Sequence, residues 1–167
     1  PNSPMSVATG EMKIDKGVLW ASAGAVTNNW QPAGSKNGLF RFTDNSWKNF
    51  NASLLPAMDS LPDCITVAID HRDATLWAGS YGGGLFSIST NNSISIYKQT
   101  SPLQAALFSP RNYRVSGLAF DQENNLWISN YGAEKNLHVR KSDGTWRSFT
   151  VPFPLTENAV SGIMVDD

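Results

Sequence analysis

The sequence contains little cysteine, histidine or net charge, and it has no long apolar runs. Its single cysteine, Cys64, cannot form an internal disulfide or supply the cysteine pairs of a zinc cluster. The 13 Lys and Arg residues nearly balance the 14 Asp and Glu residues, which leaves a net charge of −1. Nucleic acid is therefore not an expected partner, because no positive field would gather phosphates. No apolar run reaches the roughly 18 residues that a membrane-spanning helix needs.

The motifs of common catalytic and cofactor sites are also missing. His71 falls in a short turn and His138 in an expected strand, without the spacing of metal ligands. No Gly-x-Ser-x-Gly elbow occurs. The segment from Ser80 to Gly84 is rich in glycine but lacks the Lys-Ser or Lys-Thr of a phosphate-binding loop. We therefore expect no catalytic residues, no metal and no cofactor.

The chain does contain an internal repeat. A Leu-Trp pair occurs three times, and each copy follows an apolar stretch that an aspartate closes. A Leu-rich segment and an aromatic segment come after each pair. The recurring tryptophans are about 50 to 57 residues apart, which fits the four-stranded unit of a β-propeller. The recurring residues are Asp15, Trp20, Asp70, Trp77, Asp121, Trp127 and, in a fourth and partial copy, Asp166.

The segments within each unit have the pattern of short strands. They alternate with a period of about two, are rich in β-branched and aromatic residues, and are separated by Asn, Asp and Gly turns. The sequence thus predicts an all-β partial propeller with three four-stranded blades, at about 8–50, 65–97 and 115–149. The first strand of a fourth blade is expected from about residue 160.

Three blades and one strand are too few to close a ring of the usual four to eight. We therefore expect residues 1–167 to be a single fragment, roughly half of a propeller. Its neighbours would be the remaining blades of the parent chain or a second copy that pairs through the open edges.

The recurring residues have expected structural roles. Each Trp of a second strand should fill the wide space between two blades. Each aspartate precedes a turn, which favours hydrogen bonds to the turn backbone over a ring of carboxylates around the axis.

Loop lengths indicate which end of the propeller binds a ligand. The turns between the first and second strands, and between the third and fourth, are short and nearly constant. The other connections are long and variable, and such loops on a rigid scaffold usually carry binding residues. We expect a protein or glycan partner there, although Tyr81 and Tyr131 could instead simply cap strand ends. The candidate residues of this face are Asn29, Trp30, Ser80, Tyr81, Asn130, Tyr131, Arg111 and Tyr113.

One copy of the repeat resembles a known unit. Residues 121–129 read Asp-Gln-Glu-Asn-Asn-Leu-Trp-Ile-Ser, similar to the Asp-x-x-Gly-x-Leu-Trp unit of two-component-regulator β-propeller repeats. Such repeats build periplasmic sensor domains of hybrid two-component systems in Bacteroidetes, and the PorZ-type component of the type IX secretion system. Virginiamycin B lyase-like propellers have a related unit. The resemblance extends over nearly the whole chain, in three copies.

Further details resemble the PorZ type most. They are the long insertion from Trp20 to Leu39, the segment 38–42 followed by Ser46-Trp47, and the segment 101–103. The resemblance implies a non-enzymatic, extracytoplasmic binding or scaffold module in a secretion complex, in the periplasm or at the outer-membrane surface. Its partners would be proteins or lipopolysaccharide. The first alternative is a periplasmic sensor domain that recognises an oligosaccharide, and the second is a lyase-type propeller enzyme.

Overall fold

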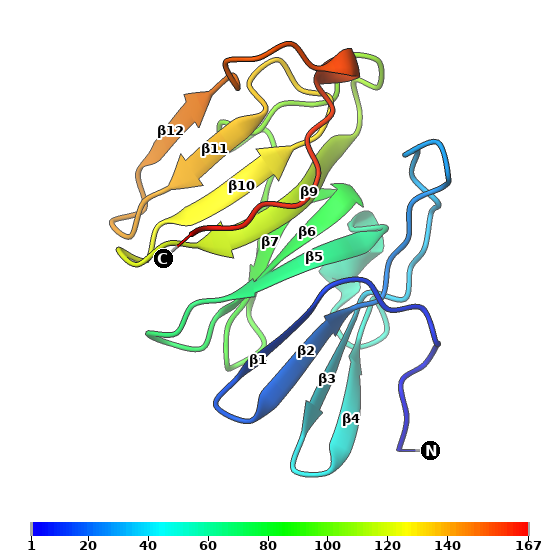
Figure 1. Cartoon of the computed structure of the whole chain (residues 1–167). Helices are drawn as coiled ribbons and strands as arrows, with labels where there is room; N and C mark the ends of the chain where they lie inside the picture. The colour runs from blue at the N-terminus through cyan, green and yellow to red at the C-terminus, as the bar shows by residue number, and fades with distance from the viewer. Residues whose placement is uncertain (1, 167) are drawn as a thin grey trace.

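The computed structural model describes residues 2–166 as three antiparallel meanders placed side by side (Figure 1). Each meander has four strands in chain order, and the hydrophobic alternation of the repeat sets which side chains face which neighbour. Blade 1 consists of β1 (Met12–Asp15), β2 (Val18–Ser22), β3 (Leu39–Thr43) and β4 (Ser46–Phe50).

Blades 2 and 3 repeat this arrangement, and they begin at Cys64 and Tyr113, slightly before the predicted positions. Blade 2 consists of β5 (Cys64–Ile69), β6 (Leu76–Gly82), β7 (Gly84–Ile88) and β8 (Ile94–Tyr97). Blade 3 consists of β9 (Tyr113–Phe120), β10 (Leu126–Asn130), β11 (Leu137–Arg140) and β12 (Trp146–Phe149). Two short 3-10 helices, Pro56–Ser60 and Thr156–Asn158, lie in the connections that follow blades 1 and 3. The chain is therefore an all-β partial propeller, as the repeat predicts.

Apolar side chains fill the space between successive blades. Trp20, Leu39 and Phe50 of blade 1 pack against blade 2 in the first core. Their equivalents in the repeat, Trp77 and Leu85 of blade 2, pack against blade 3. The second of these cores is called the 2–3 interface below, and it also contains Val115, Leu118, Leu126 and Ile128.

The same repeat positions on blade 3 have no blade beside them in the part of the chain that the structure describes. Trp127, Leu137 and Phe149 instead line an apolar hollow of about 380 Å³, together with Val151. We call this surface the open face of blade 3. The sequence predicted that Trp127 would fill a space between blades, but the structure leaves it only half-buried.

A backbone contact joins each blade to the segment that starts the next repeat copy. Tyr81 and Gly82 of β6 pair with Arg114 and Tyr113 of β9, so blades 2 and 3 share one eight-stranded sheet. Equivalent contacts run from the N–H of Gly24 to the carbonyl of Cys64 (2.7 Å) and from the N–H of Gly132 to the carbonyl of Asn158 (3.0 Å). We call these contacts the interblade latches.

The fourth repeat copy is extended but is not a hydrogen-bonded strand. The hydroxyls of Ser116 and Ser129 donate to the carbonyls of Val160 (2.7 Å) and Ser161 (2.6 Å). A Cβ at Gly117 would lie only 2.7 Å from the nitrogen of Ile163, so the glycine permits this close approach. Within residues 2–166 no strand offers this segment a ladder partner, which explains the difference from the predicted strand. No described helix is long and apolar enough to cross a bilayer.

Candidate functional site

Three blades bring an aromatic cluster together at the long-loop end of the molecule, with Trp30 in a loop, Tyr81 at the end of β6 and Tyr131 in the turn after β10. The ring of Trp30 stacks on that of Tyr131, with centroids 5.9 Å apart and planes at 11°. Tyr81 meets both rings, at 6.5 Å from Trp30 and 5.3 Å from Tyr131. The sequence placed these three residues on one binding face, and the structure brings them together, but it buries Tyr81 and Tyr131 and exposes only Trp30. We call them, together with Arg114, the loop-face cluster.

Local structure explains how Trp30 reaches the cluster. Its loop closes through hydrogen bonds from the N–H of Thr27 to the carbonyl of Gln31 and from the N–H of Trp30 to the carbonyl of Thr27, both 2.9 Å. Trp30 adopts a φ of 53°, a left-handed conformation that costs a non-glycine residue some free energy. The Tyr81 hydroxyl donates to the Trp30 carbonyl at 3.0 Å and holds the turn in this position. Trp30 remains 43% exposed, so its ring is available to a partner.

Arg114, the second residue of β9, was not among the sequence candidates. Its side chain donates to the Gln31 amide oxygen at 2.8 Å and to the Trp30 carbonyl at 3.4 Å. Its guanidinium carbon lies 5.3 Å from the centroid of the Tyr81 ring and 5.8 Å from that of Tyr131, within cation–π range. No spacing or motif marks this arginine in the sequence, because it stands at the polar start of an otherwise apolar strand.

Burial chiefly raises the pKa of the Tyr81 phenol, and the neighbouring Tyr131 raises it further. The nearby Arg114 acts in the opposite direction but does not cancel this shift. Tyr81 is therefore protonated at physiological pH and acts as a hydrogen-bond donor to the Trp30 loop. Its part in the cluster is to position Trp30.

Two predicted polar residues of this face are buried and already hydrogen-bonded. The Ser80 hydroxyl donates to the carbonyl of Pro62 and accepts from the N–H of Gly83 at 2.8 Å. The Asn130 side chain accepts from the N–H of Gln104 at 2.9 Å and donates to the carbonyl of Arg114 at 3.4 Å. These groups fix the loops beneath the cluster and are not presented at the surface.

The side chains of the remaining predicted residues are not among the ring contacts of the cluster. Asn29 is exposed, and its carbonyl accepts from the side chain of Gln31 at 3.3 Å. Arg111 is exposed in the turn before β9. Tyr113 packs against the 2–3 interface instead of facing the loops.

A small groove of about 50 Å³ opens beside the cluster. Its walls include Gln31, Arg114, Tyr131 and Phe108. Phe108 is 81% exposed, and the neighbouring Leu107 is also exposed. The groove thus has mixed walls, in which aromatic side chains lie beside Arg114, Gln31, Ser109 and Glu157.

The repeating aspartates serve turns or blade contacts. Hydrogen bonds from Arg72 chiefly lower the pKa of Asp70, although burial opposes them. Burial raises the pKa of Asp121, but hydrogen bonds from Asn125 and from the indole of Trp127 (2.8 Å) outweigh it and lower the pKa overall. Asp15 contacts His71 of the next blade at 2.8 Å, and Asp166 is exposed.

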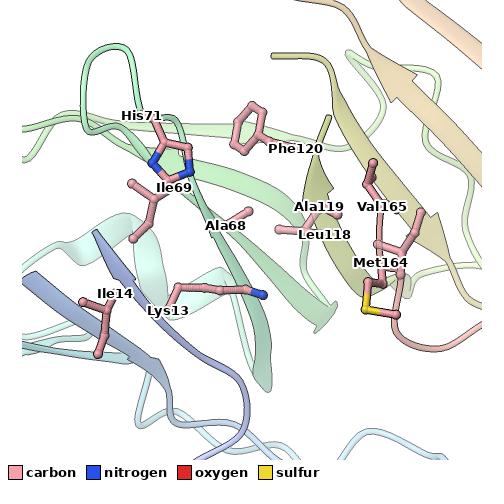
Figure 2. A pocket seen from close by; sticks show the side chains of 11 residues that line it. Lys13, Ile14, Ala68, Ile69, His71, Leu118, Ala119, Phe120, Met164 and Val165 are labelled. Carbon is pink, nitrogen blue, oxygen red and sulfur yellow. The ribbon is translucent and has the colours of Figure 1, made fainter. Parts of the chain in front are cut away.

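A second hollow, of about 340 Å³, lies at the opposite end, among the first strands of the blades and the last segment of the chain (Figure 2). Its walls are largely apolar and include Ile69, Leu118 and Val165. Lys13 reaches into this space from β1, and His71 stands at its edge. Among the described residues no group of three His, Cys, Asp or Glu side chains could hold a metal ion.

The fold belongs to the β-propeller class, and comparison with solved structures gives more detail. The chain is similar to PorZ of Porphyromonas gingivalis, described as an essential bacterial surface component of the type IX secretion system. Their TM-score is 0.77 at 25% identity, over 90% of this chain and 21% of PorZ. The chain therefore spans about a fifth of the length of that protein. Neither a protein-family model nor a curated protein sequence matches the chain.

Two further likenesses, at lower identity, concern the fold alone. Virginiamycin B lyase from Staphylococcus aureus gives a TM-score of 0.64 at 16% identity, over 95% of this chain and 45% of the lyase. The extracellular domain of the putative hybrid two-component system BT4673 from B. thetaiotaomicron gives 0.55 at 18% identity, over 99% of this chain and 26% of that domain. Structures similar to this chain thus include a secretion component, a sensor domain and an enzyme.

Proposed function

We propose that this chain is part of a non-catalytic, extracytoplasmic β-propeller that binds a protein or a glycan through its long-loop face. The proposed role is that of a scaffold module in a PorZ-like cell-surface secretion complex. The carrying observation is the loop-face cluster, in which the buried rings of Tyr81 and Tyr131 support the exposed ring of Trp30 from two other blades. Clustered aromatic and arginine side chains of this kind dominate the binding energy of many protein interfaces. The likeness to PorZ supports the secretion role over the roles of a sensor domain and of a lyase-type enzyme.

Trp30→Ala tests the binding role of the face. The ring is partly exposed, so its loss should leave the melting temperature nearly unchanged while weakening binding about tenfold or more. The probes are an array of oligosaccharides and lipopolysaccharides and an array of short peptides. His71→Ala, an exposed change at the opposite end, is the control and should bind as the wild type does. Equal binding by Trp30→Ala and the wild type would contradict the proposal.

The same face would also serve a sensor domain that recognises an oligosaccharide, and the likeness to the BT4673 domain supports this second candidate at the level of the fold. The gene surrounding the segment separates the two. Further blades followed by a membrane span and a histidine kinase would identify a sensor. A parent without a kinase, encoded beside secretion components, would favour the secretion role.

A further inference from the structure

Arg114 carries a buried positive charge without an acidic partner in the described part of the chain. The residue is only 5% exposed, and no Asp or Glu oxygen of residues 2–166 lies within ion-pair distance of its guanidinium. Glu157 lines the same groove but does not form an ion pair with it. Burying a charge is costly unless it is paired, so this arrangement needs an explanation.

The contacts that Arg114 does make compensate its charge only in part. Of the five N–H donors of a guanidinium, two are used, by the Gln31 amide oxygen and the Trp30 carbonyl. The Nε–H group is buried without a partner. The rings of Tyr81 and Tyr131 attract the cation but accept no strong hydrogen bond. One N–H on each of the two Nη atoms therefore remains without an acceptor, and Arg114 lines the groove from which an acceptor would reach them.

The equivalent residue of blade 2 shows what full compensation looks like. The carbonyls of Asp63 and Arg114 accept from the N–H groups of Tyr81 and Tyr131, respectively, so the two residues occupy the same repeat position. The buried Asp63 carboxylate accepts from the N–H groups of Gly34 (2.8 Å) and Ser35 (2.7 Å). Both residues tie blade 1 to a later blade. Each carboxylate oxygen of Asp63 accepts a hydrogen bond, whereas the Nε–H of Arg114 has no acceptor.

The groove beside Arg114 favours a small anionic group. Its volume of about 50 Å³ accommodates a few water-sized groups, such as the carboxylate of a side chain. Its lining combines Phe108, Ala106 and Tyr131 with the polar Gln31, Ser109 and Glu157. The exposed Trp30 ring stacks on Tyr131 beside it. The amide and hydroxyl groups that would hold a sugar, those of Asn130 and Ser80, are already occupied by the backbone.

We propose that the loop face recognises an acidic segment of a partner protein. An Asp or Glu carboxylate of that segment pairs with the Arg114 guanidinium in the groove, and a neighbouring apolar side chain packs on Trp30 and Phe108. This inference rests on the proposed function, because it names the ligand of the same face. Arg114 supplies the specificity for charge, while Trp30 and Phe108 supply contact area.

The experiment uses an array of short peptides in matched pairs. One member of each pair has Asp or Glu beside Leu, Phe or Trp, and the other has Asn or Gln at the acidic position. The wild type should retain the acidic member at least about tenfold better than its amide counterpart. Arg114→Met should lose this preference. Arg147→Met, the same change at an exposed position on β12, should keep it. Thermal melts of each variant check folding.

Phe108→Ala keeps the test valid if Arg114→Met fails to fold, because Phe108 is exposed and contributes little to the core. This variant should bind the acidic peptides more weakly than the wild type does, while it preserves the preference for acidic over amide peptides. Equal binding of acidic and amide peptides would overturn the inference. Binding of oligosaccharides instead of peptides, lost in Trp30→Ala, would also overturn it and leave the proposed function standing. If the wild type binds neither the peptides nor the oligosaccharides, both this inference and the proposed function are contradicted.

Discussion

The 2–3 interface and the open face of blade 3 are built from the same repeat positions but have different surroundings. Trp77 is 5% exposed and Leu85 is fully buried, because blade 3 covers them. Their counterparts Trp127 and Leu137 lie on the open face, where Phe149 is 40% exposed. The Leu-Trp repeat therefore marks a surface that can be covered, and the presence of a neighbouring blade determines whether that surface becomes a core.

The largest expected effect comes from truncating the two equivalent tryptophans. Trp77→Ala should lower the free energy of unfolding by about 3–5 kcal/mol, because it opens a cavity in a covered core. Trp127→Ala should cost clearly less, since part of its ring already contacts solvent. Denaturant titrations of both variants measure the difference. Equal losses would show that the two faces are not distinct in the way described.

The covered side of blade 3 also contains a group that responds to pH. His138 pairs in register with Ile128 at the position that Phe86 occupies in blade 2. It is fully buried, its Nδ1 lies 2.8 Å from the Ser148 hydroxyl, and burial lowers the pKa of His138 to about 4. The unfolded chain, with an ordinary histidine pKa near 6.5, therefore binds the proton more readily than the folded chain.

Stability should accordingly be complete above about pH 6.5 and fall as the pH is lowered towards 4, by a total on the order of 3 kcal/mol from this group. Denaturant titrations across this range, with His138→Phe alongside the wild type, isolate the contribution. The phenylalanine variant reproduces the residue of blade 2 and should lose this part of the pH dependence. An unchanged pH profile in the variant would show that His138 is not the group responsible.

The smallest expected effect concerns the open face itself. Phe149→Ser should change the free energy of unfolding by less than about 1 kcal/mol, because the ring is partly exposed and has no blade against it. It should still reduce binding of a hydrophobic dye, since it removes part of the apolar hollow. Dye fluorescence together with a melt checks both. A strong loss of stability would indicate that the open face is covered in solution.

The repeat predicted most of the fold because each blade restates the same pattern. The positions of Trp20, Trp77 and Trp127 locate the second strands, and the alternation around them locates the others. The sequence could not indicate that residues 160–166 would be extended without forming a strand. That outcome depends on whether another strand lies beside the segment to form hydrogen bonds with it, and the sequence of the segment does not contain this information.

The candidate site was predictable in outline only. Loop lengths placed Trp30, Tyr81 and Tyr131 at one end of the blades, where the structure brings them together. They could not separate surface groups from structural ones, since Ser80 and Asn130 look equally polar in sequence but are satisfied internally. Arg114 was not predicted as a site residue because its role depends on its burial beside the rings of Tyr81 and Tyr131. No local sequence pattern encodes that burial.

The interblade latches have a consequence for how the chain acquires its structure during synthesis. Each latch joins a blade only to the segment that directly follows it, as in Gly24 with Cys64 or Gly132 with Asn158. Contacts of this kind between adjacent units allow folding to begin at one unit and propagate to the next, and the contacts of the loop-face cluster between blades 1 and 3 follow. During synthesis, a blade can thus form its latch as soon as the segment that starts the next repeat copy has been made. Until the following segment has docked, the most recently formed blade then leaves its apolar face uncovered, as blade 3 does in the structure.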